Sequence, residues 1–98
     1  MADSPEYRLL ETPGFRKDLD GLGAPASRRI RATLQARVYP ILRATPRHVP
    51  SAARLRDWEP PTWRIRIGNW RVFDEIDDEN HIVSLIAADH RKDAYERR

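Results

Sequence analysis

Arginines alternate with aromatic and aliphatic residues in the segment 63–73, which reads Trp-Arg-Ile-Arg-Ile-Gly-Asn-Trp-Arg-Val-Phe. Because side chains along a β-strand point alternately to opposite faces, Arg64 and Arg66 share one face of a strand whose other face is apolar. A guanidinium group binds phosphate through two parallel hydrogen bonds, whereas a lysine acts as a point charge. The spacing therefore predicts a β-hairpin with one apolar face and one cationic face suited to a phosphate.

Gly68-Asn69 lies between the two halves of this segment and is typical of a tight hairpin turn. Such a turn places Arg66 opposite Arg71, and Arg64 opposite Phe73. Like charges directly opposite each other destabilise a sheet, so stability alone does not explain the pair of Arg66 and Arg71. We infer that an anion binds there, and that these arginines face the surface and contribute little to folding. A solvated face of a basic protein is the alternative.

The length of 98 residues predicts a single domain, 1–98, with one modest core. The formal net charge is only +3, although the pI is about 9.8, so a strongly basic surface has to be local. Arginine supplies nearly all of the positive charge, since Lys17 and Lys92 are the only lysines. This composition favours a nucleic acid as partner.

The chain contains no cysteine, which excludes disulfides, zinc fingers and thiol catalysis. His48, His81 and His90 are scattered without the spacing of metal ligands, so we expect no metal and no cofactor. The N-terminus lacks the basic and apolar regions of a signal peptide, and no apolar run approaches the ~20 residues of a membrane span. We therefore expect a cytoplasmic protein.

The first half of the chain predicts a short strand and two helices. Residues 7–11 form a brief strand at a sheet edge, and Thr12 and Pro13 are of the types that cap and begin a helix. A second helix begins at Ala24, and we expect the two helices to form a hairpin. Pro40 predicts a kink in the second helix or its end just before this residue. The apolar stripe of the second helix consists of Ile30, Leu34, Val38 and Ile41.

The second half predicts a long loop, the hairpin and a central strand. Residues 45–61 are rich in proline and have little periodicity, which indicates a loop, and Arg54 and Arg56 within it could extend the cationic surface. Residues 81–88 are apolar on both faces, as in a strand that is covered on both sides. Residues 89–95 follow as a loop and a short terminal turn. The expected fold is α+β, with two N-terminal antiparallel helices packed on a small, mainly antiparallel four-stranded sheet.

Three segments of the chain carry a resemblance to a known family. They are the hairpin 63–73, the segment Asp-His-Arg-Lys-Asp-Ala-Tyr at 89–95, and Phe-Arg-Lys-Asp-Leu at 15–19. In this order and spacing they resemble the RelE/ParE superfamily of bacterial toxins from type II toxin-antitoxin pairs. The resemblance covers nearly the whole chain and implies a RelE-like fold and a cognate antitoxin as partner. Members of the superfamily either cleave messenger RNA in the ribosomal A site or poison DNA gyrase.

The RelE-type members are ribonucleases, and the resemblance implies which residues would form the site. In those enzymes it consists of basic residues of the first hairpin strand, an arginine that opens the second strand, an arginine after the last strand and a nearby tyrosine. These positions correspond to Arg64, Arg66, Arg71, Arg91 and Tyr95. The basic residues expected to bind RNA around the site are Arg54, Arg56 and Lys92.

The reaction implied by the resemblance uses the ribose 2′-hydroxyl as nucleophile on the adjacent phosphate and needs no metal. An arginine can stabilise the charge of the transition state but cannot act as general base, because its pKa stays above about 12. Some RelE-type enzymes have lysines where this chain has Arg64 and Arg66, so the choice of general base differs here. The candidates for the general base are therefore His90, Glu75 and Tyr95. Alternatively, His90 binds backbone and Tyr95 anchors the tail on the core.

The leading interpretation is a toxin of RelE type, a ribosome-dependent endoribonuclease that cleaves messenger RNA in the A site and halts translation, with contacts to 16S ribosomal RNA. Retention of the full basic set and of the terminal tyrosine favours it, because a gyrase poison has no need of them. The first alternative is a ParE-like toxin that binds DNA gyrase and cuts no RNA. The second is a non-catalytic module that binds its antitoxin or its own operator.

Overall fold

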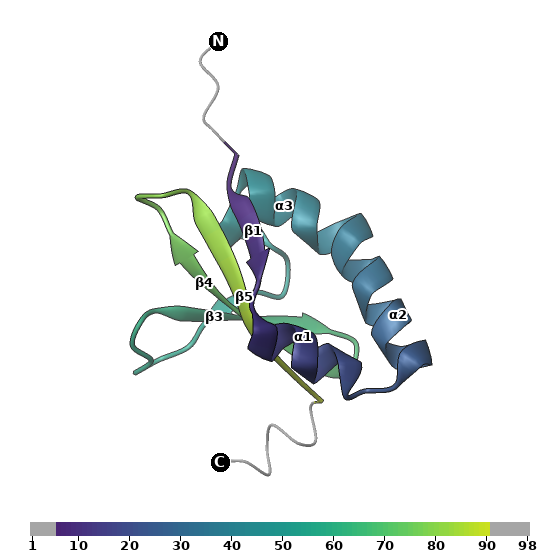
Figure 1. The fold of residues 1–98 in the computed structure, drawn as a ribbon. Coiled ribbons are helices and arrows are strands. Elements are labelled where there is room, and N and C mark those ends of the chain that lie inside the picture. Colours follow the sequence, from purple (N-terminus) through teal and green to yellow (C-terminus); the bar gives the residue numbers. More distant parts are fainter. Residues whose placement is uncertain (1–5, 91–98) are drawn as a thin grey trace.

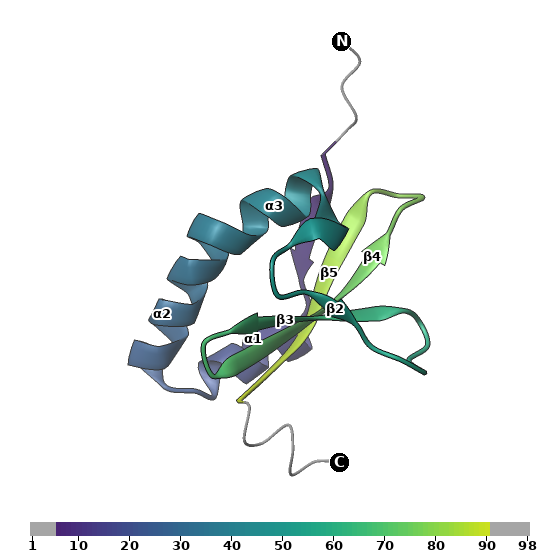
Figure 2. The same ribbon diagram turned by 180° about the vertical axis from the view of Figure 1, so that it is seen from behind.

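Residues 6–90 are described by the computed structural model of this chain. Figures 1 and 2 show the fold from opposite sides. The elements in chain order are β1 (Arg8–Glu11), α1 (Pro13–Asp20), α2 (Ala24–Thr33), the π-helical turn η1 (Leu34–Val38), α3 (Tyr39–Ala44), the 3-10 turn η2 (Pro46–His48), β2 (Ala53–Arg54), β3 (Thr62–Ile67), β4 (Trp70–Asp77) and β5 (Ile82–His90).

The strands form one five-stranded sheet in the order β1-β5-β4-β3-β2. β1 runs parallel to β5, and the other neighbouring pairs are antiparallel. The α+β class and the mainly antiparallel sheet are thus confirmed, and β1 lies at an edge as predicted. The expected count of four strands is one too low, because β2 falls within the segment predicted to be a loop. Such a short strand cannot show an alternating pattern in the sequence.

The start of α1 agrees with the prediction from Thr12 and Pro13. The Thr12 hydroxyl oxygen accepts a hydrogen bond from the backbone N–H of Phe15 at 3.2 Å, which satisfies one of the free donors at the helix start. The same hydroxyl donates to the backbone oxygen of Leu85 at 2.9 Å. One side chain therefore caps α1 and joins it to β5. Phe15 and Leu19 of this helix are fully buried.

The second helix does not end at Pro40 but continues to the end of α3. Proline has no backbone N–H, and its ring crowds the preceding turn of a regular α-helix. Directly before Pro40 the helix contains the π-helical turn η1, in which the N–H of Tyr39 donates to the backbone oxygen of Leu34, five residues earlier. A π-helical turn of this kind accommodates the proline and bends the helix. Of the two predicted outcomes, a kink rather than an end is observed.

The core lies between the helices and one face of the sheet. α1 is in front of the sheet in Figure 1 and behind it in Figure 2. On the sheet, the buried apolar residues alternate along the strands and share one face, because Ile65, Val72 and Ala88 lie opposite one another across β3, β4 and β5. The second helix contributes three buried residues of its predicted stripe, Ile30, Leu34 and Val38, while Ile41 is partly buried.

β5 extends beyond the strand predicted at 81–88. It begins one residue later, since His81 lies in the preceding turn with a φ of +56°. At its far end, Asp89 and His90 pair with the first two residues of β4. The prediction of a loop from residue 89 is therefore wrong for these two residues, because backbone pairing with β4 continues the strand although their side chains are polar.

Candidate nucleic-acid interface

The β3–β4 hairpin has the predicted register. Arg66 lies opposite Arg71, and Arg64 lies opposite Phe73. Gly68 opens the turn with a φ of +58°, a conformation that costs glycine little because it has no Cβ. Since the core residues of these strands occupy the alternate positions, the side chains of Arg64, Arg66, Arg71 and Phe73 lie on the side of the sheet that faces away from the helices. We call this surface the arginine face.

Arg66 is exposed, and its backbone is held by Ser51. The Ser51 hydroxyl donates to the backbone oxygen of Arg66 at 3.0 Å and accepts from the backbone N–H of Arg66 at 3.2 Å. This pair of bonds replaces the strand partner that β3 lacks beyond the short β2. The side chain of Arg66 thus projects from a fixed point of the edge. The sequence contains no signal for this role of Ser51, which arises from contacts across the loop.

Arg64 is half-buried and carries a donor without a partner. Its Nε atom is buried and makes no hydrogen bond to any residue of the described range 6–90. Neither Arg64 nor Arg66 forms an ion pair in that range. Leaving a buried donor unsatisfied costs about 1–3 kcal/mol, and more for a charged group. A bound anion would satisfy this donor and neutralise both side chains.

Arg71 differs from the surface-facing residue that the sequence predicted. Only 7% of its surface is exposed. β4 lies between β3 and β5, so Arg71 has Arg66 opposite it on one side and Asp89 opposite it on the other. Opposite charges across a ladder stabilise a sheet, and Asp89 at this position offsets the repulsion between the two arginines. The repulsion between Arg66 and Arg71 is therefore weaker evidence for a bound anion than it is in the isolated hairpin.

Arg54 and Arg56 do not extend the arginine face as a continuous row. Arg54 lies opposite Trp63, and side chains that are directly opposite share a face, so Arg54 is assigned to the other side of the sheet. Arg56 is exposed in the loop after β2. Both arginines line a shallow cavity beside Trp58. Their basic groups therefore lie around the loop rather than in line with Arg66.

An aromatic pair that the sequence did not reveal lies on the arginine face. The ring of Trp58 stacks on the ring of Phe73 with centroids 6.2 Å apart and an angle of 7° between the planes. The loop that carries Trp58 is held by a bond from the N–H of Leu55 to the oxygen of Thr62, at 2.9 Å, and by one from the Thr62 hydroxyl to the oxygen of Pro60, at 2.9 Å. Half of Trp58 is exposed. The sequence signal for it was a tryptophan in a proline-rich loop, for which the sequence indicated no role.

Of the three candidates for the general base, Glu75 is the one whose side chain lies in the described part of the chain. It lies on the side of the arginine face but four residues from Arg71 along β4, a separation of about 13 Å at the rise of a strand. A carboxylate at that distance cannot take a proton at a phosphate held by Arg66 and Arg71. The remaining predicted site groups, namely Arg91, Lys92, Tyr95 and the side chain of His90, lie outside the described part of the chain.

Asp74 is a buried carboxyl group on the opposite, core-facing side of β4. It is 1% exposed, and neither of its oxygens has a hydrogen-bond partner in the range 6–90. Its pKa is raised from 3.8 to about 7, mainly by burial; the positive charge of Arg47 acts against this rise, and the negative charge of Glu75 adds to it. Because it faces the core, Asp74 cannot serve a ligand on the arginine face.

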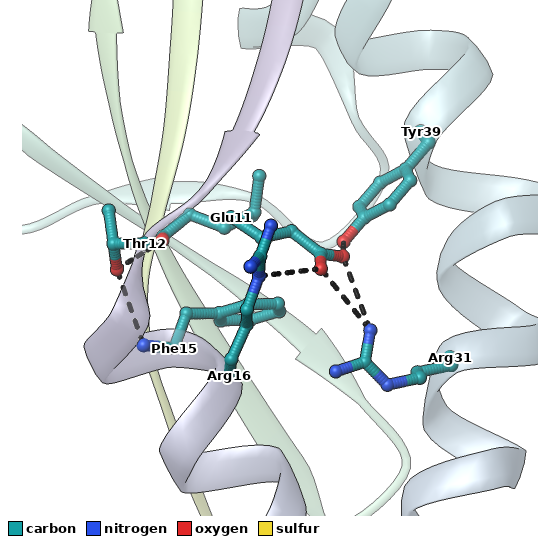
Figure 3. A network of polar contacts seen from close by, with 7 residues as sticks. Glu11, Thr12, Phe15, Arg16, Arg31 and Tyr39 are labelled. Carbon is teal, nitrogen blue, oxygen red and sulfur yellow. Dashed lines mark hydrogen bonds and ion pairs between the residues drawn. The ribbon is translucent and has the colours of Figure 1, made fainter.

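A second polar cluster joins the first strand to the helices, as Figure 3 shows. The Glu11 carboxylate accepts a hydrogen bond from the Tyr39 hydroxyl at 2.7 Å and from Arg31 at 3.2 Å, and Arg16 lies 3.8 Å away. Burial, and then the hydrogen bond to Glu11, raise the pKa of the Tyr39 hydroxyl, so it stays protonated. The cluster links β1 to α1, α2 and α3. It positions the helices and lies away from the arginine face.

Within residues 6–90, no group of three or more histidine, aspartate or glutamate side chains is placed to hold a metal ion. No helix of that range is long and apolar enough to cross a membrane. The arginine face combines guanidinium groups with a stacked aromatic pair. Such a surface is suited to phosphates and unpaired bases.

The sequence and the fold match those of known toxins. The family described as ParE toxin of type II toxin-antitoxin system, parDE, matches residues 9–95. The toxin-antitoxin complex RelBE2 from Mycobacterium tuberculosis contains a chain that is 30% identical, with a TM-score of 0.69, and the match covers 92% of this chain and 98% of that one. A comparison with curated proteins finds no match.

Two further solved structures share the fold at lower identity. The RelB-RelE complex from Methanococcus jannaschii matches at 20% identity with a TM-score of 0.68, over 90% of this chain and 96% of that chain. The isolated RelE toxin of E. coli matches at 18% identity with a TM-score of 0.61, over 93% and 97%. The chain is thus a toxin of a type II toxin-antitoxin system. It belongs to the ParE toxin family within the RelE/ParE superfamily.

Proposed function

We propose that this toxin is of RelE type, a ribosome-dependent endoribonuclease that cleaves messenger RNA in the ribosomal A site. The observation that supports it most is the arginine face. Arg64 and Arg66 form no ion pair within residues 6–90, and Arg66 lies directly opposite Arg71. The guanidinium groups of Arg64 and Arg66, which have no ion pair in that range, are suited to the phosphate of a nucleic acid.

In the proposed reaction, the ribose 2′-hydroxyl oxygen attacks the adjacent phosphorus while the bond from phosphorus to the 5′-oxygen breaks. The products are a 2′,3′-cyclic phosphate and a 5′-hydroxyl, and the proton lost by the nucleophile is balanced by the proton gained by the leaving oxygen. Arg66 and Arg71 stabilise the negative charge that develops on the phosphate oxygens. Since an arginine cannot take the proton, that step falls to His90, to Tyr95 or to a group of the ribosome.

The ribosome has a defined part in this proposal. The described part of the arginine face supplies cations without a complete acid-base pair, because Glu75 is too distant from Arg66 and Arg71. Holding the messenger RNA in an attack geometry can itself contribute several kcal/mol to the barrier. We therefore assign the positioning of the substrate to the A site, with contacts to 16S ribosomal RNA.

The proposed protein partner is a cognate antitoxin. Similar toxins from Mycobacterium tuberculosis and Methanococcus jannaschii are seen in complex with theirs. A cationic surface is complementary to an acidic segment, which would lie across the sheet or the helices and neutralise it. Both the antitoxin and the RNA would then compete for the same charges.

A second candidate function is favoured by the family match itself, which is to ParE toxins. A ParE-type toxin would bind and poison DNA gyrase and would cut no RNA. Primer extension on messenger RNA, with and without ribosomes, tests the ribonuclease proposal, and a supercoiling assay with purified gyrase tests the alternative. Cleavage that requires ribosomes supports the first. Loss of supercoiling with intact messenger RNA would assign the chain to the second.

A further inference from the structure

We propose that Trp58 is a stacking platform for an unpaired RNA base. In this arrangement the exposed part of its ring, backed by Phe73, binds a base of the strand whose phosphates lie against the arginines. The inference rests on the proposed function in taking RNA as the ligand. It adds a binding subsite on the loop between β2 and β3, away from the scissile phosphate at Arg66 and Arg71.

The geometry of the pair is that of a preformed platform. The rings of Trp58 and Phe73 are nearly parallel, at 7°, with centroids 6.2 Å apart, which is an offset stack. Half of the Trp58 surface is exposed, although burial of a tryptophan is strongly favourable. A tryptophan held flat and left half-exposed offers a π-surface, and every nucleobase can stack on such a surface.

The loop that carries Trp58 is closed by hydrogen bonds in the absence of a ligand. Its two ends are joined where Leu55 donates to the backbone oxygen of Thr62, and inside the loop the Thr62 hydroxyl donates to Pro60. Thr62 itself is 1% exposed, so this anchor is protected from water. Because the aromatic pair and the loop are already ordered, little conformational entropy is lost when a base stacks.

The charges around the pair favour a nucleic acid. Phe73 lies opposite Arg64, so the platform adjoins the arginine whose buried Nε lacks a partner in the range 6–90. The cavity beside Trp58 is lined by two basic and two acidic residues, Arg54, Arg56, Asp57 and Glu59. A strand with its base on Trp58 would therefore have the guanidinium group of Arg64 within reach of a phosphate on the side of the arginine face.

The other exposed large apolar residue of the described range, Leu10, has the opposite surroundings. It is 48% exposed and lines a cavity that also contains Glu75 and three neighbouring acidic residues, Asp77, Asp78 and Glu79. Phosphates would be repelled there. The cavity at Trp58 is lined largely by polar and charged residues, which also disfavours an apolar anchor of a protein partner as the occupant.

The experiment measures binding of the full chain to a short, unstructured 2′-O-methyl RNA, which the proposed reaction cannot cleave, and to a sugar-phosphate chain of equal length without bases. Fluorescence anisotropy gives both affinities. Trp58→Ala should weaken RNA binding about 5- to 140-fold, which corresponds to ~1–3 kcal/mol for one stacked base at 1.4 kcal/mol per tenfold. Binding of the chain without bases should not change. Trp58→Phe should retain most of the affinity, and Leu10→Ala should bind like the wild type.

Several results would overturn the inference. Trp58→Ala could bind RNA like the wild type, could lose the same factor on the chain without bases, or could keep RNA binding and lose only antitoxin binding. An Arg66→Ala variant separates this from the proposed function. If it weakens binding to both chains while Trp58→Ala has no effect, the RNA ligand stands and only the stacking subsite is wrong. If the wild type binds neither chain, the stacking subsite is wrong, and the proposed function is decided separately by primer extension on ribosomes.

Discussion

Arg66 and Arg71 carry the same charge at opposite positions of one hairpin, but their burial differs. Arg66 is exposed, whereas Arg71 is 7% exposed and lies between Arg66 and Asp89. If both arginines contact phosphate, removal of either should lower the cleavage rate, but the two removals should affect stability differently. For Arg66 the side chain can be lost without a cavity, and for Arg71 it cannot.

Arg66→Ala should lower the cleavage rate on ribosomes by about two to three orders of magnitude, the usual effect of removing one donor that stabilises a developing oxyanion. Its melting temperature should remain that of the wild type. Arg71→Ala should lower both the rate and the free energy of unfolding, the latter by about 1–3 kcal/mol, because Asp89 loses its cross-strand cation. Rates come from primer extension, and stabilities from urea unfolding.

The matched control for this pair is Arg28→Ala, an exposed arginine of α2 that does not lie on the sheet. Arg28→Ala should change neither the cleavage rate nor the free energy of unfolding. Arg71→Lys should recover much of the stability but little of the rate, since it keeps the charge and loses the planar fork. If Arg66→Ala cleaves like Arg28→Ala, the arginine face is a solvated surface. If Arg71→Ala is as stable as the wild type, the buried Arg71 side chain does not contribute to the free energy of unfolding.

Asp74 should make stability depend on pH. Its pKa is about 7 in the folded protein against 3.8 ordinarily, so between these values the folded state holds a proton that the unfolded chain has lost. Stability is therefore highest below the unfolded value and falls as pH rises through about 7, by roughly 4 kcal/mol in all. Asp74→Asn should be more stable than the wild type at pH 8 and nearly equal to it at pH 4.

Urea unfolding at pH 4, 6 and 8 checks this, with Glu75→Gln as the control. Glu75 is the next carboxyl along β4 but points to the other face of the sheet. Because the charge of Glu75 raises the pKa of Asp74, its removal should move the loss of stability to a slightly lower pH without abolishing it. A profile of Asp74→Asn that is parallel to that of the wild type would show that the carboxyl is already charged, or solvated, in the folded state.

At the scale of elements, the start of α1 offers a test of how the first helix is attached. Thr12 bonds both the N–H of Phe15 and the backbone oxygen of Leu85. Thr12→Ala should cost about 0.5–2 kcal/mol for the lost cap, towards the upper end because the bond to β5 is lost as well. Thr12→Ser keeps the hydroxyl and should cost much less. Equal losses in the two variants, measured by urea unfolding, would show that the methyl group matters and the hydroxyl does not.

Elements with a strong local pattern were predictable from the sequence. The hairpin register follows from alternation on both sides of Gly68-Asn69, and the start of α1 follows from Thr12 and Pro13. Elements that depend on pairing with a distant strand could not be predicted from the sequence. β2 forms by pairing with the edge of β3, and Asp89 continues β5 by backbone pairing with β4. A local pattern of residues does not contain such information.

The candidate site shows the same division. The sequence predicted that Arg64, Arg66 and Arg71 share a face, and the register confirms it. It did not predict that Arg71 is buried, or that Trp58 reaches back onto Phe73, because both result from how separate segments pack. The roles of these residues in binding and catalysis remain predictions.

Across the whole molecule, charge is separated along the sheet. The arginines lie towards the β3–β4 turn, and at the other end Glu75, Asp77, Asp78 and Glu79 line one cavity. A net charge of +3 therefore conceals a strongly basic surface and an acidic one. A polyanion should approach with its phosphates towards the turn, and this orientation should weaken as salt screens the charges.

The prediction that concerns the whole protein is made in cells. Overproduction of the wild-type chain should stop growth and translation, and co-expression of the neighbouring gene, as the expected source of an acidic antitoxin, should restore growth. Arg66→Ala should permit growth, because its phosphate contact is lost while the fold persists, and Arg28→Ala should be as toxic as the wild type. Growth, incorporation of labelled amino acids and messenger RNA integrity are followed together. Normal growth and translation under wild-type overproduction would contradict the toxin function, whereas arrest with intact messenger RNA and altered DNA supercoiling would favour a gyrase poison.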